Sequence, residues 1–341
     1  MPSVTMRDVA RRAGVSIKTV SNVVNGYPYI RDATRARVLE AIDELGYQMN
    51  LTARSLRASR TGIIALAVPE VSLPYFAELS EAVIRIAHEN DLTVMVEQTG
   101  GKRERELTVL SSARGHLVDG VIFSPLALGP EDADSLRVPF PMVLLGERIF
   151  HGPVDHVTME NVVAARAAVE HLIATGRRRV AIIGTHAGEV VGTAALRHEG
   201  YLQALRAAGL KVSPRLAADA SPWHRSTGAE AMVRLLNSGA RFDAVFGLND
   251  TLALGALRVL LRHGVRVPDD VAVIGFDDIE ESRYCTPTLS TIDPGREQIA
   301  RTAVEVLVER MGGAAAGSDH REVFAHFTLE ARESTLGVAV A

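Results

Sequence analysis

The sequence has little cysteine, few aromatic residues and no long apolar run. Cys285 is the only cysteine among 341 residues, so the chain can form no intramolecular disulfide and no cysteine-based metal cluster. No apolar run approaches the roughly 18 residues that a membrane-spanning helix needs. The first residues are polar and charged, unlike a signal peptide. We therefore expect a cytoplasmic protein without membrane association.

Catalytic motifs are equally scarce. The glycine-containing stretch IIGTHAGEVVG (182–192) is neither a G-x-G-x-x-G fingerprint nor a P-loop, and neither H-E-x-x-H nor G-x-S-x-G occurs. Asp277 and Asp278 are paired acids that could serve acid–base chemistry or hold a metal. Their place at the end of an apolar run suits hydrogen bonding to a ligand better. We expect no enzyme, no cofactor and no metal site.

Charge is distributed unevenly along the chain. Residues 1–60 carry ten Lys and Arg against five Asp and Glu, a net charge of +5, while the chain as a whole has −4. The remainder therefore carries −9. A basic head on an acidic body indicates that the head meets a polyanion.

Three short helical patterns fill this head. TMRDVARRAGV offers Thr5 as an N-cap with Asp8 three residues later, and Gly14 ends the helix. Ser16 caps the second pattern, SIKTVSNVVNG. The third, ATRARVLEAIDELGY, is apolar at i, i+4 and i+7 and stops at Gly46. Two helices joined by a tight turn predict a helix-turn-helix.

The second pattern has an outer face of small and polar residues near its N-terminus. A helix that reads base edges in the major groove needs such a face. The alternative is an ordinary three-helix core with a solvated side. The residues on the face are Ile17, Lys18, Ser21 and Asn22.

The linker LTARSLRASRTG (51–62) is basic and has helical spacing, where a flexible linker would be rich in Gly, Ser or Pro. Leu56 stands alone between Arg54 and Arg57, with no core to join in its own segment. This leucine can pack under the next domain, or it can contact another molecule.

Three segments, TMRDVARRAGVSIKTVSNVVNG, TRARVLEAIDELGY and ARSLR, resemble the lac repressor (LacI/GalR) family of bacterial transcription regulators, and the likeness extends over essentially the whole chain. Members often have Ser where this chain has Arg31, so Asp32 is the expected cap of the third helix. The resemblance implies a homodimer on palindromic operator DNA. Its expected major-groove residues are Ser16, Ile17, Lys18, Thr19, Ser21 and Asn22.

The resemblance also gives the linker a role. In this family the linker forms a hinge helix on operator DNA, and a leucine from each subunit enters the minor groove as a wedge. Leu56 matches the wedge, with Ala53 and Arg57 beside it. An apolar wedge unstacks a base step at a cost of about a few kcal/mol, and the resulting bend brings more protein onto the DNA.

Beyond Gly62, apolar runs alternate with amphipathic helical segments. Runs that are apolar on both faces predict parallel sheets covered by helices on both sides. We expect two Rossmann-like lobes resembling a periplasmic binding protein, with the segment from Pro287 to about Phe327 crossing back to the first lobe. The expected domains are a helix-turn-helix head (1–49), a hinge helix (50–60) and an effector body (61–341), with an N-lobe of 61–160 and 292–325 and a C-lobe of 161–291 and 326–341.

Ligands in open α/β sheets bind beyond the carboxyl ends of strands. This rule selects the loops after the runs GIIALAV, RRRVAIIG, DAVFGLN and VAVIGFDD, and the family resemblance selects the same places. An aromatic plate, an arginine, an amide and a carboxylate suit a polyhydroxylated ring. The expected effector-binding residues are Tyr75, Phe76, Arg197, Trp223, Asn249 and Asp277.

Each of these residues also has a purely structural interpretation. Asn249 could cap the helix that follows it, although Asp250 is the better-placed cap. The two aromatic residues at 75 and 76 could be core or dimer contacts. Arg197 could form a surface ion pair, and Trp223 could simply pack in a core.

We therefore predict a DNA-binding transcription regulator, a repressor whose operator affinity is controlled by a small-molecule effector, most simply a sugar. A purine-type effector remains an alternative, because paired aromatic residues also stack on bases. Two rivals from other classes are a solute-binding protein and a sugar-metabolising enzyme with a DNA-binding head. We expect a dimer, since LEARESTLGVAVA (329–341) is too short for a tetramerising heptad helix.

Overall fold

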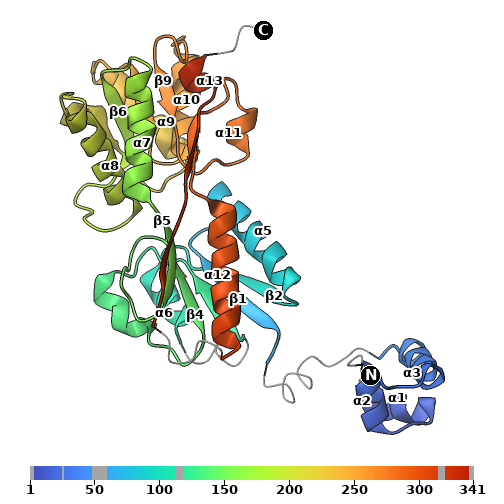
Figure 1. The fold of residues 1–341 in the computed structure, drawn as a ribbon. Helices are drawn as coiled ribbons and strands as arrows, with labels where there is room; N and C mark the ends of the chain where they lie inside the picture. Colours follow the sequence, from blue (N-terminus) through green and yellow to red (C-terminus); the bar gives the residue numbers. More distant parts are fainter. Residues whose placement is uncertain (1–3, 25–26, 48–59, 112–117, 314–318, 338–341) are drawn as a thin grey trace. The chain divides into compact units, whose positions relative to one another are not determined.

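The computed structural model describes residues 4–24, 27–47, 60–111, 118–313 and 319–337. The chain divides into two compact units, Met1–Thr61 and Gly62–Ala341. We call the first unit the head and the second the body (Figure 1). None of the helices in the described ranges is long and apolar enough to cross a membrane.

The head consists of α1 (Met6–Ala13), α2 (Ile17–Val24) and α3 (Asp32–Leu45), as the sequence predicts. The apolar side chains of the three helices face one another and exclude water, which is the main source of stability for so small a unit. The buried core is formed by Val9, Ala10, Ala13, Val20, Val23, Val38, Ala41 and Tyr47.

The helix ends of the head follow the predicted capping pattern. The Thr5 backbone N–H donates to Asp8 Oδ2 at 3.0 Å, and Gly14 closes α1 in the left-handed conformation with φ 64°. The Thr19 N–H donates to Ser16 Oγ at 3.1 Å. Ser16 therefore satisfies a backbone donor that the first turn of α2 would otherwise leave unpaired.

The expected cap of α3 is wrong. Arg31 is the N-cap residue, with φ −59° and ψ 135°, and Asp32 is already the first helical residue. The Arg31 carbonyl accepts the N–H groups of Thr34 at 2.9 Å and Arg35 at 3.0 Å, so the backbone starts the helix without a side-chain cap. Asp32 instead places its negative charge in the first turn, where the helix dipole favours it.

The first lobe of the body, here the N-lobe, contains a six-stranded parallel sheet in the order β11-β5-β4-β3-β1-β2. Helices cover both faces of the sheet, which explains the continuous apolar runs of its central strands. Its strands are β1 (Ile63–Val68), β2 (Thr93–Gln98), β3 (Gly120–Phe123), β4 (Met142–Leu145), β5 (Asp155–Met159) and β11 (Glu322–Ala325). Its helices are α5 (Pro74–Glu89), α6 (Arg103–Val109), η1 (Pro130–Leu136) and α12 (Arg296–Met311).

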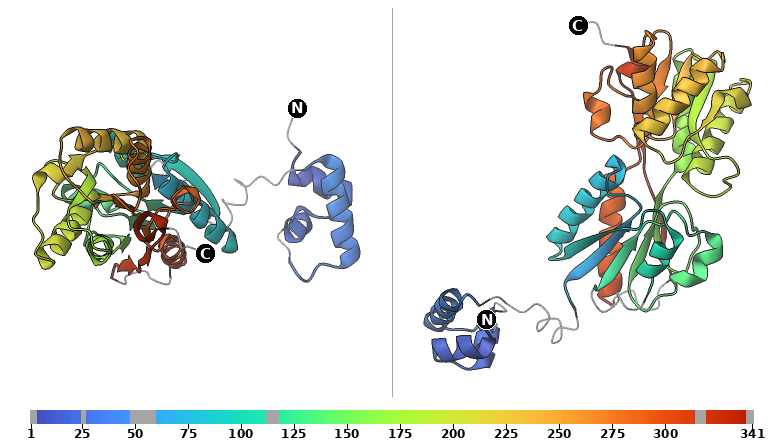
Figure 2. Two further views of the ribbon diagram at one scale, coloured as in Figure 1. Left: turned by 90° about the horizontal axis from the view of Figure 1, so that it is seen from above. Right: turned by 180° about the vertical axis from the view of Figure 1, so that it is seen from behind.

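The second lobe, here the C-lobe, has a four-stranded parallel sheet in the order β7-β6-β8-β9. Seen from behind in Figure 2, α9 and α10 lie on the face opposite to α7. The strands are β6 (Val180–Thr185), β7 (Ala217–Asp219), β8 (Ala244–Gly247) and β9 (Ala272–Ile274). The helices are α7 (Asn161–Ala174), α8 (Thr193–Ala207), η2 (Pro214–Leu216), α9 (Arg225–Asn237), α10 (Asp250–Arg262), α11 (Glu281–Tyr284) and α13 (Glu333–Leu336).

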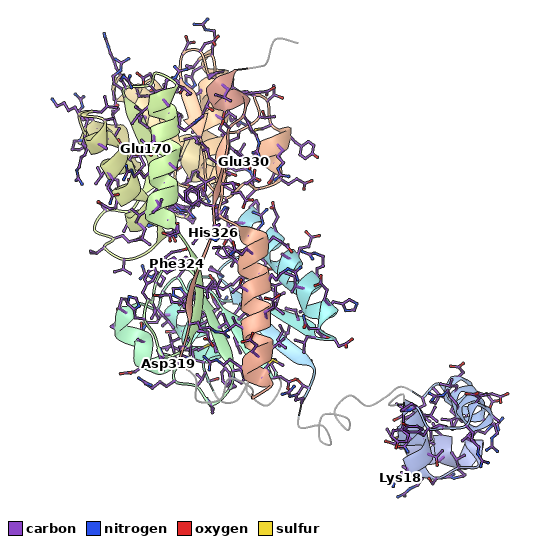
Figure 3. The ribbon with its side chains drawn as sticks, viewed as in Figure 1. Lys18, Glu170, Asp319, Phe324, His326 and Glu330 are labelled. Carbon is purple, nitrogen blue, oxygen red and sulfur yellow. The ribbon has the colours of Figure 1, made fainter. Side chains whose placement is uncertain are left out.

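The two lobes are joined by three chain crossings. The chain leaves the N-lobe between β5 and α7, returns between β10 (Thr291–Asp293) and α12, and leaves again between β11 and β12 (Thr328–Glu330). Figure 3 labels Asp319, Phe324, His326 and Glu330 along the last of these crossings. The segment after Pro287 thus contributes α12 and β11 to the first lobe.

Two strands differ in burial from what their composition suggests. β5 reads DHVTM and is buried although three of its five residues are polar, because it lies between β4 and β11. β2 reads as an apolar run, yet Met95 and Val96 are 40% and 37% exposed because it is an edge strand. Apolar content therefore misses a central strand with polar residues and does not distinguish an exposed edge strand from a buried one.

Candidate functional site

A cleft of about 580 Å³ lies between the two lobes of the body. It opens where strands of both sheets end, as ligand sites in open α/β sheets do. Its lining includes all six side chains that the sequence predicts to face a ligand, namely Tyr75, Phe76, Arg197, Trp223, Asn249 and Asp277.

Arg197 of α8 is the most firmly held of these side chains. It is only 3% exposed. Its Nε donates to Asn161 Oδ1 at 2.8 Å, its Nη1 donates to the Leu248 carbonyl, and its guanidinium carbon lies 3.5 Å from the centre of the Phe276 ring. A guanidinium fixed by hydrogen bonds and by an aromatic face is preorganised. The surface-pair interpretation of Arg197 therefore does not fit.

Asp277 follows β9, is buried and lines the cleft. Its Oδ1 lies 3.4 Å from Arg197 Nη1. Burial raises the pKa of Asp277 to about 7, although the Arg197 charge opposes that rise. Its φ of 118° is one that residues other than glycine rarely adopt, and such backbone strain gathers at functional sites.

Asn249 caps α10, and the expectation that Asp250 would do so is wrong. Asn249 Oδ1 accepts the Leu252 N–H at 2.9 Å. The Asp250 carboxylate is buried and accepts hydrogen bonds from Ser282 and Thr291, so it serves the core instead. Burial raises the pKa of Asp250 to about 6. The described residues provide no hydrogen-bond acceptor for Asn249 Nδ2, so this group remains available to a ligand.

Aromatic side chains form the walls of the cleft. Trp223 is oriented by a hydrogen bond from its Nε1 to the Gly184 carbonyl at 2.9 Å. Tyr75 and Phe76 begin α5, with their ring centres 5.2 Å apart in an edge-to-face arrangement. Such rings can cover the flat or apolar face of a bound ring.

Sequence reasoning missed a second group of cleft residues, which connects the lobes. The Thr193 hydroxyl of the C-lobe donates to Glu147 Oε2 of the N-lobe at 2.5 Å, and Arg148 donates to the Val191 carbonyl. Glu147 is the last residue of the stretch PMVLLGE, two residues after the end of β4. The strand-end rule would have found it if applied to every run.

The polar lining also includes a hydroxyl with unsatisfied hydrogen bonding. Thr158 Oγ1 on β5 is buried, and the described residues offer it no partner. Asp278, in contrast, turns away from the cleft: its carboxylate pairs with Arg332 and Arg283. The adjacent carboxylates of Asp277 and Asp278 therefore face different surroundings and do not form one site. Within the described residues no group of three or more His, Cys, Asp or Glu could hold a metal ion.

In the head, the predicted reading surface lies on α2. Ile17 is 40% exposed, and Lys18 lies at the outer face of the head (Figure 3). Ser16 and Thr19 have a local role, since their hydroxyls are 2.9 Å apart and Ser16 caps the helix. The predicted hinge residues Ala53, Leu56 and Arg57 lie outside the described residues.

Two family models match the chain. One, for bacterial regulatory proteins of the lacI family, matches residues 5–50. The other, for a periplasmic binding protein-like domain, matches residues 169–335. Together they cover the head and most of the body.

Curated relatives match almost end to end. Catabolite control protein A of Priestia megaterium is 32% identical over 310 residues, which is 91% of this chain and 93% of the relative. The ribose operon repressor of Escherichia coli K12 is 33% identical over 310 residues, with 90% of this chain and 93% of the relative covered. These relatives are regulators rather than enzymes.

Solved structures share both sequence and fold. A putative LacI-family regulator from Sanguibacter keddieii is 52% identical, with a TM-score of 0.76 over 82% of this chain and 100% of that one. The CelR–cellobiose complex is 31% identical, with a TM-score of 0.70 over 97% and 99%. A lac repressor dimer bound to operator and an anti-inducer is 28% identical, with a TM-score of 0.83 over 98% and 99%. The chain therefore belongs to the LacI family and is a DNA-binding transcription regulator with an effector-binding body.

Proposed function

We propose that a small polyhydroxylated molecule binds in the cleft of the body and controls the affinity of the head for a palindromic operator. The observation that carries this proposal is the convergence of Arg197, Trp223, Asn249 and Asp277 with the two aromatic residues of α5 on one cleft. Vicinal hydroxyls donate to Asp277 and accept from Arg197 and Asn249. Trp223 covers the apolar face of the ring.

The effector is most simply a sugar. Among the similar proteins, one is named a ribose operon repressor and one was solved with cellobiose. A purine is the second candidate, because three aromatic rings line the cleft and a relative from Pasteurella multocida is named PurR. We infer that the chain itself is not an enzyme, since Asp277 and Asp278 face different partners.

On the DNA side, the major groove is read by Ile17, Lys18, Ser21 and Asn22. Ser16 and Thr19 hold the start of α2 against the DNA backbone. Ala53, Leu56 and Arg57 form the minor-groove hinge. Because operator binding requires access to the chromosome, we place the protein in the cytoplasm.

A homodimer suits a palindromic operator, because each subunit then reads one half-site. The exposed apolar edge of the N-lobe at Met95 and Val96, with Ile84 of α5, offers a surface for a second copy. The lac repressor bound to operator is a dimer, which supports the same assembly here.

The test selects bound sequences from random double-stranded DNA with the full-length protein. We expect an inverted repeat whose binding weakens when the matching effector is added. Asn22→Ala should cost about 1–3 kcal/mol at one symmetric position and leave random-DNA affinity nearly unchanged. Selection of an unstructured, non-repeating sequence set would contradict the proposal.

A further inference from the structure

The cleft carries more negative than positive side chains. Two arginines line it, Arg148 and Arg197. Four acidic residues line it as well: Glu70, Glu147, Glu189 and Asp277. Charge in a partly enclosed site acts at close range and through little water, so this imbalance bears on which ligands can enter.

Both arginines are already engaged by the protein. Arg197 donates to Asn161 and to the Leu248 carbonyl. Arg148 donates through Nε to the Leu128 carbonyl at 3.2 Å and through Nη1 to the Val191 carbonyl. These bonds occupy Nε and Nη1 of each guanidinium, so mainly the Nη2 group of each remains to donate to a ligand, and the charge of each arginine is shared with protein acceptors.

The carboxylates differ in how far they are compensated. Glu70 pairs with His224 at 3.0 Å, and Glu189 pairs with His186 at 2.6 Å.

Among the described residues, Glu147 accepts a side-chain hydrogen bond only from the neutral Thr193 hydroxyl, and Asp277 accepts only the long contact, 3.4 Å, from Arg197. Both carboxylates are buried, one in each lobe. They are the acceptors that the described residues leave largely unsatisfied.

Both carboxylates influence the same group of the cleft, the Tyr75 hydroxyl. Burial raises the pKa of the Tyr75 hydroxyl far above its ordinary value; the charges of Glu147 and Asp277 add to the rise, and those of Arg296 and Arg197 oppose it. Tyr75 itself lines the cleft. A ligand beside this hydroxyl therefore lies near one carboxyl group of each lobe.

We propose that the effector has no net negative charge and presents hydroxyl or ammonium donors to Glu147 of the N-lobe and Asp277 of the C-lobe. This inference rests on the proposed function and names the charge class of its ligand. Glu147 is then a specificity-determining residue: it accepts from a donor on the ligand and repels phosphate or carboxylate at the same position. Neutral sugars, amino sugars and nucleosides fit the cleft, whereas sugar phosphates and uronates do not.

The experiment measures binding by calorimetry to the full-length protein with matched probes: glucose, glucosamine, glucuronate and glucose 6-phosphate; ribose and ribose 5-phosphate; adenosine and AMP. We expect each anionic probe to bind at least about tenfold more weakly than its uncharged parent, or not at all. An anionic probe that binds more tightly than its parent overturns the proposal.

Glu147→Gln sharpens the test, because the amide oxygen still accepts the Thr193 hydroxyl while the charge is gone. In this variant the difference in binding affinity between each parent probe and its anionic derivative should become smaller. Glu104→Gln, at an exposed position of α6, is the matched control and should leave this difference unchanged. An unchanged difference in Glu147→Gln removes Glu147 from the specificity role.

A ligand-free measurement decides the case in which no probe binds. If two buried carboxylates face the cleft with little compensation, the double variant Glu147→Gln, Asp277→Asn should raise the melting temperature of the unliganded protein at about pH 8. A lower or equal melting temperature overturns the proposal. An anionic molecule that releases operator DNA would refute this inference alone, whereas operator binding that no small molecule alters would refute the proposed function.

Discussion

The guanidinium carbon of Arg197 lies 3.5 Å from the centre of the Phe276 ring, one residue before Asp277 in the chain. The aromatic face and the carboxylate therefore fix the same cation from two sides. Because α8 supplies the arginine and the loop after β9 supplies Phe276 and Asp277, a ligand at this point would contact two elements of the C-lobe at once.

Arg197→Lys should abolish the effector response while leaving operator binding intact. Lysine keeps the charge but loses the planar fork that reaches Asn161 and the Leu248 carbonyl, so we also expect a loss of about 1–3 kcal/mol in the free energy of unfolding. Calorimetry and urea unfolding measure the two effects. Arg206→Lys, on the exposed side of the same helix, is the control. Equal ligand affinity in wild type and Arg197→Lys would remove Arg197 from the site.

Asn249 combines two roles that substitution can separate. Asn249→Ser keeps an oxygen that caps α10 but lacks the amide nitrogen, so stability should stay within about 0.5 kcal/mol while ligand affinity falls. Asn249→Ala should lose both, with about 1 kcal/mol less stability. Urea unfolding and calorimetry on both variants distinguish the roles. Full ligand affinity in Asn249→Ser would mean that Asn249 is a cap alone.

The stability of the body should depend on the protonation of Asp277. Burial raises its folded pKa to about 7, above that of the unfolded chain. Its stabilising contribution is therefore complete below about pH 4 and is lost as the pH rises through 7.

Asp277→Asn removes this titration. Relative to wild type, the variant should gain stability between about pH 5 and about pH 8, as followed by urea unfolding at both values. The comparison cancels the titration of other carboxylates, such as Asp155, which the variant leaves unchanged. A stability difference that is the same at both pH values would show that Asp277 does not titrate in this range.

For the hinge, Leu56→Ala should leave ligand binding nearly intact and reduce both operator affinity and operator bending, because the unstacked base step loses its filler. A flexible pyrimidine–purine step at the operator centre should be preferred.

Arg57→Ala should instead make the salt dependence of operator binding shallower by about one unit, if Arg57 neutralises one phosphate. Gel-based bending assays and titrations at several salt concentrations separate the two, with Leu39→Ala, an exposed leucine of α3, as control. An unchanged bend in Leu56→Ala would mean that this leucine contacts protein.

The sequence predicts much of this molecule because its signals are local. Capping residues such as Thr5 and Ser16 act within one turn, and central strands such as β1 and β6 are buried on both faces, so their composition alone marks them. β5 could not be found in this way, since its polar residues find partners only through the tertiary fold. Its Asp155, for example, pairs with Arg310 of α12 at 2.6 Å.

The cleft residues likewise divide into those that the sequence predicts and those that it does not. Residues after recognisable strands, such as Asp277, could be predicted, because the fold class determines where strands end. Glu147 and Thr193 could not be predicted as a pair, because their contact depends on how far the two lobes close. The roles of Asn249 and Asp250 were exchanged for a related reason: only burial shows that Asp250 serves the core.

The central claim is that occupancy of the cleft sets the affinity of the head for DNA. The most direct measurement is a fluorescence anisotropy titration of the selected operator, with and without saturating effector, for wild type and Arg197→Lys. We predict that the effector changes the wild-type operator dissociation constant by at least about fivefold and leaves that of Arg197→Lys unchanged. An equal shift in both proteins, or no shift in wild type with an effector that calorimetry shows to be bound, would contradict the account.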